Sequence, residues 1–355
     1  SFSTFSDYFV HAGAVAAVLV LAAATSVHVL WPASATFAGL AAGYLVHRLV
    51  GGREPSGTLG LIALGVAWIA AVEAVNFGSW NAAALAPLAA GYALIASRRL
   101  SIIPRTAPYF IHAASAGGFF LLVVDLALRG VWLPNVVAAT AAAYLVAYLV
   151  DVVLNRRQES AVVALTMFGV AWVCLTDALH LGTWRGAATS PLVTLYALVA
   201  FRAERLGEVG RLLSLHARWL AHVAAAAALL LAFGDMYAAG HWIAWTGSLT
   251  LVGLTAGYLL FALLGVTVEG AVLAQLAFGV AWTLSSTDLH LGVWRGASLT
   301  LLVALYGLIA YRGGRVGRAG SVFARYASPR IHGAAAVALA LTAYSVLTAG
   351  AWLPW

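Results

Sequence analysis

Apolar segments of about 20 residues follow one another along almost the whole of this 355-residue chain. A helix of about 20 residues rises about 30 Å, the thickness of the hydrocarbon core of a bilayer. Only 9% of the residues are charged, against about a quarter in a typical soluble domain, so the chain lacks the polar side chains needed to cover a surface in water. The sequence therefore predicts an all-α, polytopic integral membrane protein.

The chain also repeats itself. The sequence Gly-Val-Ala-Trp occurs three times, ending at Trp68, Trp172 and Trp282, and a second Trp follows each of these 12 residues later. Four further segments carry a His and a Trp 20 residues apart, and their His residues are His11, His112, His222 and His332. Self-similarity at a fixed spacing is typical of tandem structural repeats.

Each full copy contains four apolar segments, so we expect about 13 transmembrane helices in three tandem four-helix repeats plus the first helix of a fourth. The predicted repeats are residues 1–105, 106–210 and 211–320, and a single helix follows within 321–355. The predicted spans are 8–31, 34–51, 58–77 and 81–98; 108–131, 135–154, 160–181 and 186–203; 217–240, 243–265, 268–291 and 296–312; and finally 330–353.

The distribution of arginine predicts the orientation. The chain contains no Lys, and all but three of its Arg residues lie in connectors at one end of the predicted helices. The three at the opposite end are Arg129, Arg185 and Arg295. The positive-inside rule assigns the Arg-rich end to the cytoplasm. We therefore expect a multi-pass protein of the cell membrane with a cytoplasmic N-terminus and an extracytoplasmic C-terminus, and a polypeptide that continues beyond Trp355.

Polar residues within membrane helices are candidates for function because burying them costs free energy. One group lies at the outer end of the predicted helices: Glu73, Asp125, Asp177, His180, Arg185, Asp235, Asp288, His290 and Arg295. The first copy has Asn76 and Asn81 where the later copies have His and Arg, and this joint loss predicts that the His and the Arg serve one purpose. Asp288 lies one position later than its counterparts, so we expect it to point about 100° away from them.

Two interpretations of this outer group remain open. The acids could share a proton or a cation along a transport path. Alternatively, they form structural ion pairs with the three outer Arg residues, while the His and Arg anchor the chain at the headgroups. We favour the structural interpretation.

A second group consists of His11, His112, His222 and His332, each of which is followed by small residues. An imidazole beside a flat helix surface can ligate the metal of a haem or chlorophyll, so a tetrapyrrole is the candidate cofactor. Small residues are equally suited to close packing of helices in lipid, and we take packing as the default interpretation.

Several functional signatures are missing. The sequence has no phosphate loop, no His-Glu-x-x-His and no Gly-x-Ser-x-Gly, and its lone Cys174 excludes an intramolecular disulfide. We predict no catalytic residue, no metal site and no nucleic-acid partner. The leading prediction is a non-enzymatic membrane subunit that anchors or organises a larger assembly, with bound lipid and partner membrane proteins. The alternatives are a transporter or channel that uses the outer acids and His, and a tetrapyrrole-binding subunit.

Overall fold

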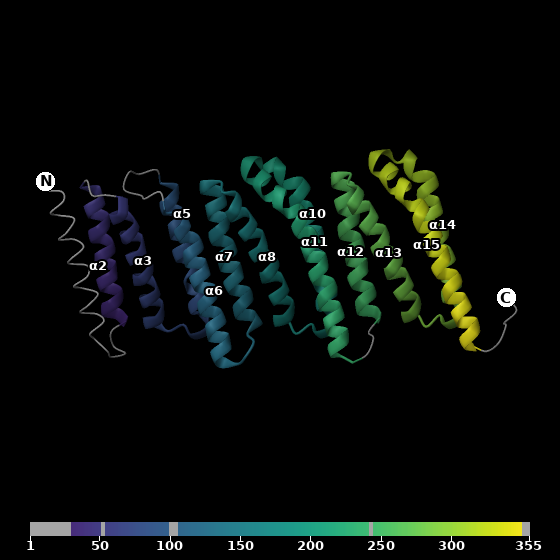
Figure 1. Ribbon diagram of the computed structural model, residues 1–355, viewed down its shortest axis with the longest axis horizontal. Helices are drawn as coiled ribbons and strands as arrows, with labels where there is room; N and C mark the ends of the chain where they lie inside the picture. Colours follow the sequence, from purple (N-terminus) through teal and green to yellow (C-terminus); the bar gives the residue numbers. More distant parts are fainter. Residues whose placement is uncertain (1–29, 51–53, 99–105, 241–243, 350–355) are drawn as a thin grey trace. The chain divides into compact units, whose positions relative to one another are not determined.

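The computed structural model describes residues 30–50, 54–98, 106–240 and 244–349, and every regular element within these ranges is a helix (Figure 1). Ten of the described segments are long and apolar enough to cross a membrane. The chain is therefore an all-helical, multi-pass membrane protein, as predicted. Residues 8–29 of the first predicted span, with His11, lie outside the described residues, as does Trp352.

The chain divides into two compact units, residues 1–174 and 175–355, and the division falls within α8 (Gln158–Ala178). In the first unit, α2 packs on α3, and α5 packs on both α6 and α7. The core of this unit includes Leu61, Tyr92, Ile111 and Tyr144, all of which are buried. The bounds of its helices are α2 (Leu30–Leu49), α3 (Glu54–Val75), α4 (Asn81–Ala84), α5 (Ala86–Ser97), α6 (Tyr109–Arg129) and α7 (Pro134–Asn155).

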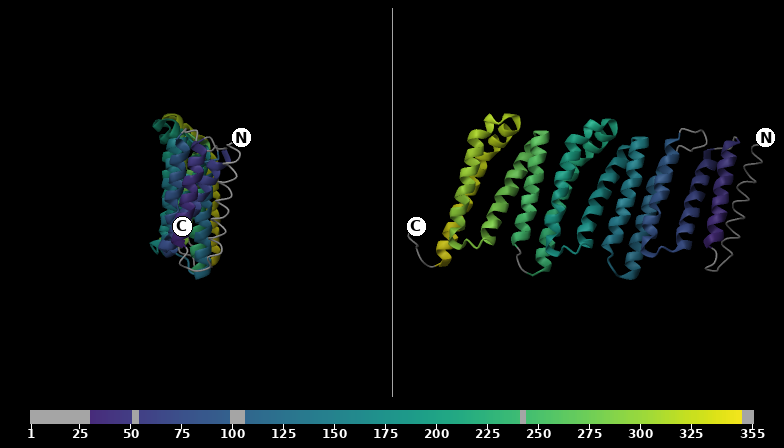
Figure 2. Two further views of the ribbon diagram at one scale, coloured as in Figure 1. Left: turned by 90° about the vertical axis from the view of Figure 1, so that its left-hand side faces the viewer. Right: turned by 180° about the vertical axis from the view of Figure 1, so that it is seen from behind.

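In the second unit, α10 packs on α11 and α12, α12 packs on α13, and α14 packs on α15. The α12–α13 pair lies side by side in both Figure 1 and Figure 2. The helices of this unit are α9 (Arg185–Thr189), α10 (Pro191–Arg202), α11 (Gly207–Ala238), α12 (Ala244–Gly265), α13 (Val268–Asp288), α14 (Arg295–Arg312) and α15 (Gly317–Ala349).

A proline decides whether the fourth apolar segment of each copy is one helix or two. Pro87 and Pro191 stand in the first turn of α5 and α10, directly after the short helices α4 and α9. Proline lacks an N–H group and its ring clashes with the preceding turn, so a helix is interrupted there. The third copy has Leu301 at the aligned position, and α14 runs unbroken over 18 residues.

Most predicted bounds agree with the structure to within a few residues, but two helices begin much earlier than predicted. α11 begins at Gly207 rather than 217, and α15 begins at Gly317 rather than 330. The additional turns carry Arg211 and Arg318, which the prediction had placed in connectors. A search for apolar length misses such turns, because a helix satisfies its own backbone hydrogen bonds and can continue past the hydrocarbon into the polar headgroup region.

Candidate functional site

Arg185 forms ion pairs with two acids in the second unit. The Arg185 guanidinium donates from Nη1 to Asp177 Oδ1 at 2.8 Å and from Nε to Asp235 Oδ1 at 3.1 Å, and its Nη2 also contacts Asp235. Asp177 lies at the end of α8 and Asp235 near the end of α11, so one cation joins two helices to the start of α9. Asp235 is only 5% exposed, and the pair neutralises a carboxylate that would be costly to bury alone.

In the first unit, the acid that corresponds to Asp235 pairs with a different Arg residue. Asn81 stands at the position of Arg185 and donates to Glu73 Oε1 at 3.2 Å. Asp125, the counterpart of Asp235, accepts a hydrogen bond at 2.8 Å from Arg129 Nε, one helical turn further along α6. The counter-charge therefore comes from the same helix as the acid. These contacts are the ones that the structural interpretation of the outer acids expects.

The third copy lacks this arrangement. Asp288 is buried and accepts a hydrogen bond at 2.8 Å from Ser248 Oγ on α12, instead of meeting Arg295. The one-residue offset seen in the sequence accounts for this, because it turns the side chain towards a different neighbour. Ser345 occupies the position of Asp235, and the buried Nε of Arg295 has no hydrogen-bond partner in the part of the chain that the structure describes.

The outer His residues are not part of the acid–Arg pairs that the structure describes. His180 and His290 are exposed, and their side chains make no hydrogen bond within the described part of the chain. Both have a φ of 52°, and Asn76, which replaces them in the first copy, has a φ of 53°. His and Asn adopt the left-handed conformation more readily than most residues, so these positions are helix terminations.

The His residues of α6 and α11 each pair with a tyrosine on the following helix. His112 Nδ1 lies 3.0 Å from Tyr148 OH, and His222 Nδ1 lies 3.0 Å from Tyr258 OH. Each tyrosine thus fixes the orientation of an imidazole ring. His332 on α15 is exposed and makes no such contact with any described residue. The described residues contain no cluster of three potential metal ligands, and neither pair includes a second His.

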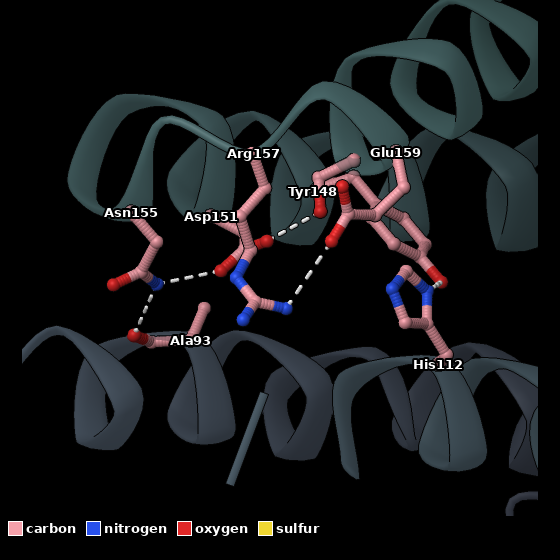
Figure 3. Close-up of polar contacts among 8 residues, drawn as sticks. Ala93, His112, Tyr148, Asp151, Asn155, Arg157 and Glu159 are labelled. Carbon is pink, nitrogen blue, oxygen red and sulfur yellow. Dashed lines mark hydrogen bonds and ion pairs between the residues drawn. The ribbon is translucent and has the colours of Figure 1, made fainter. Parts of the chain in front are cut away.

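Sequence reasoning missed a buried acid at the Arg-rich end of α7, shown in Figure 3. Asp151 is completely buried, accepts a hydrogen bond at 2.6 Å from Asn155 Nδ2, and is bonded by Ser160 Oγ at the start of α8. Asn155 Nδ2 also donates to the carbonyl oxygen of Ala93 on α5 at 3.0 Å. No Arg within the described residues pairs with Asp151, since the nearby Arg157 contacts Glu159. Asp151 lies within the predicted span 135–154, and an Asp inside a membrane span is the sequence feature that indicates such a site.

The position of Asp151 has a polar counterpart in the first copy. His47 aligns with Asp151 and Ser56 with Ser160, and His47 Nδ1 lies 2.9 Å from Ser56 Oγ. In the third copy the aligned residue is Phe261, whose ring centroid lies 5.0 Å from that of Phe201 on α10. The same place on the helix therefore serves polar contacts in two copies and aromatic packing in the third.

The repeated aromatic residues connect helices within each unit. Trp68 and Trp282 donate from Nε1 to a backbone carbonyl 16 residues later, at 3.0 and 3.1 Å. Tyr92 and Tyr306 donate to a carbonyl 31 residues earlier, at 2.7 and 2.5 Å. In the third copy, a Cβ on Gly279 would lie 2.9 Å from the Tyr306 hydroxyl. The Gly-Val-Ala-Trp motif is thus a helix-packing motif, in which Gly admits a tyrosine and Trp bonds to the next helix.

An open apolar pocket lies within the second unit. It has a volume of about 600 Å³, and its lining from α12, α13, α14 and α15 includes Leu259, Phe278, Ile309 and Phe323. A lining of this kind suits the acyl chain of a lipid.

Comparison of the chain with models of known protein families, with curated proteins and with solved structures found no match.

Proposed function

We propose that this chain is a non-enzymatic scaffold of a membrane, an integral subunit that anchors or organises a larger assembly of membrane proteins. The observation that carries the proposal is the bridge from Arg185 to Asp177 and Asp235. These acids were the main candidates for a transport path, and in the structure their charge is neutralised by a contact that joins three helices. A path for ions instead requires ionisable groups that can exchange a partner.

The proposal includes an arrangement in the membrane. Three four-helix repeats and a thirteenth helix cross the cell membrane, the Arg-rich helix ends face the cytoplasm, and the C-terminus lies outside. The contacts of Trp68 and Trp282, made at the same sequence separation, support the repeat. The pocket beside α14 accommodates a lipid acyl chain.

Depletion of the protein from its own cells tests this function. We expect one membrane assembly to disperse, so that its proteins shift to smaller complexes on a native gel and recover when the wild-type chain is restored. If every membrane complex keeps its size after depletion, the scaffold function is wrong.

Transport of protons or monovalent cations is the second candidate, and Asp151 favours it. This carboxylate is completely buried and is bonded by neutral donors, Asn155 and Ser160, without a cationic partner among the described residues. Buried acids of this kind mark ion and proton paths in many membrane proteins.

Flux into vesicles containing the purified protein tests the second candidate. Transport predicts a flux that Asp151→Asn abolishes. Asp125→Asn is the matched control, because that acid already pairs with Arg129. A wild-type flux no greater than that of empty vesicles would eliminate this candidate.

A further inference from the structure

Two polar residues of the second unit stand at positions where the other copies have apolar residues. They are Gln275 on α13 and Arg330 on α15. The residues aligned with Gln275 are Leu61 and Leu165, and those aligned with Arg330 are Phe110 and Leu220. A polar group within a membrane helix costs free energy unless it is bonded, so these two exchanges need a reason.

The first unit shows what this place contains when it is apolar. Leu61 and Tyr92 are buried there, and Phe110 packs against them with its ring centroid 5.4 Å from that of Tyr92. Tyr92 OH donates to the carbonyl oxygen of Leu61 at 2.7 Å. In the second unit, Tyr306 OH donates to the carbonyl oxygen of Gln275 at 2.5 Å. The two places therefore correspond in structure as well as in sequence.

In the second unit this place is a pocket between α13, α14 and α15, with a volume of about 560 Å³. Gln275, Tyr306 and Arg330 line it, and most of the other lining residues are apolar, among them Leu302 and Ala334. A cavity of this size, with an apolar lining and a few polar groups, is typical of a site for a small organic ligand.

The pocket opens on an apolar side of the helices. Leu276, which lines it, is 48% exposed, and the aligned Ile62 of α3 is 46% exposed. The first unit has helices both before and after this place in the sequence, and the aligned side is nonetheless open to the same extent. The opening is therefore a feature shared by two copies, and a molecule dissolved in the bilayer can enter the pocket from that side.

Gln275 presents an acceptor that lacks a donor. The residue is only 4% exposed, and its Nε2 donates to the carbonyl oxygen of Phe323 at 2.9 Å. This bond fixes the orientation of the amide, because the reversed orientation would set two acceptors against each other. The buried Oε1 has no hydrogen-bond partner among the described residues.

Arg330 presents a donor that lacks an acceptor. Its Nη1 donates to the carbonyl oxygen of Tyr326 on the same helix, while its buried Nε has no hydrogen-bond partner in the described ranges. One side of the pocket thus needs a donor and another needs an acceptor. A hydroxyl group supplies both, since it donates one hydrogen bond and can accept two.

We propose that this pocket binds an amphipathic lipid alcohol, a molecule with a hydroxyl head and a long apolar tail. The hydroxyl donates to Gln275 Oε1 and accepts from Arg330 Nε, while the tail lies along the apolar lining and leaves past Leu276. A carboxylate or phosphate diester head could accept from Arg330 but could not donate to Gln275. The site goes beyond the scaffold function and does not depend on it.

Binding of geranylgeraniol to the full chain in lipid discs tests the proposal. The tritiated alcohol gives the dissociation constant directly, and competition by its methyl ether gives that of a ligand that can accept but cannot donate. We expect saturable binding, with the alcohol bound roughly 5-fold more tightly than the ether, because only the alcohol satisfies Gln275 Oε1. Equal binding of the two ligands to the wild type, or no saturable binding of the alcohol, would overturn the proposal.

Gln275→Leu reproduces the residue of the first and second copies, and it separates a lost contact from a lost fold. The variant should bind the ether as the wild type does and should no longer prefer the alcohol. A preference for the alcohol that persists in this variant would show that the hydroxyl does not meet Gln275, and the proposal would be wrong.

Arg330→Leu, which reproduces Leu220, should weaken binding of the alcohol and the ether alike, by roughly 10-fold, since both oxygens accept from the guanidinium. Arg330→Lys should recover part of this loss. The matched control is Arg325→Leu, which makes the same exchange on α15 at an exposed residue outside the pocket and should leave both dissociation constants unchanged. Equal losses for Arg325→Leu and Arg330→Leu would contradict the site. Depletion of the protein tests the scaffold function separately, so either proposal can fail while the other stands.

Discussion

The charged residues at the outer ends of the helices differ in the partners that they contact. Arg185 bridges two acids, Arg129 pairs with the acid one turn before it, and the buried Nε of Arg295 has no hydrogen-bond partner among the described residues. A carboxylate moved out of water needs a counter-charge or several donors, so these differences predict different costs of mutation.

Arg185→Gln should destabilise the protein by about 2–4 kcal/mol, because it leaves Asp177 and the buried Asp235 without a cation. Arg129→Gln is the control, and it should cost less than about 1 kcal/mol, since the Arg129 side chain is 47% exposed and contacts one acid, one turn away on its own helix. The free energy of unfolding, from denaturant titration in detergent micelles, measures both. Equal losses for the two variants would contradict the assignment.

Ser345→Asp should stabilise the protein. It places a carboxylate where the third copy has Asp235, and Arg295 then gains the partner that its buried Nε lacks among the described residues. We expect a gain of about 1 kcal/mol in the same titration. Ser345→Asn, which adds the shape without the charge, should give no gain, and a loss of stability in the Asp variant would refute the aligned geometry.

At this scale the sequence predicted some contacts and missed others. The offset of Asp288 could be read from its spacing, because one residue on a helix is a turn of about 100°. The role of His180 could not be predicted from the sequence. His and Arg change together between copies both when the two residues contact each other and when each has a role of its own. Asp151 was overlooked because no counterpart acid recurs in the other copies.

Individual helices are determined mainly by local chemistry. Pro87 and Pro191 divide a segment that Leu301 leaves whole. Helix ends were predictable within a few residues where the apolar stretch ends with the helix. They were not predictable for α11 and α15, whose first turns are polar, because hydropathy reports the length of the apolar stretch and not the length of the helix.

The left-handed backbone conformation of His180 predicts that the free energy of unfolding depends on which residue occupies this position. His180→Val should destabilise the protein by about 1–2 kcal/mol, because a β-branched residue is strained at a φ of 52°. His180→Asn, which reproduces Asn76 of the first copy, should leave the free energy of unfolding nearly unchanged. If the Asn variant loses as much as the Val variant, the imidazole itself is required and the residue has a role beyond ending α8.

Across the whole molecule, polar and apolar side chains have different roles. Acids, His and Tyr form contacts between helices within each unit, while many large apolar side chains of the described helices are exposed. Large exposed apolar faces on a helical membrane protein suit contact with lipid or with other helices. Membrane character and helical class were predictable from composition and segment length, whereas the division into two units within α8 was not, since it depends on packing.

The mass of the particle that leaves the native membrane in a lipid disc tests the scaffold account most directly. The account predicts a particle that contains several polypeptides, with further copies of this chain or partner membrane proteins in fixed proportion. A particle that contains a single copy of this chain and lipid alone would contradict it.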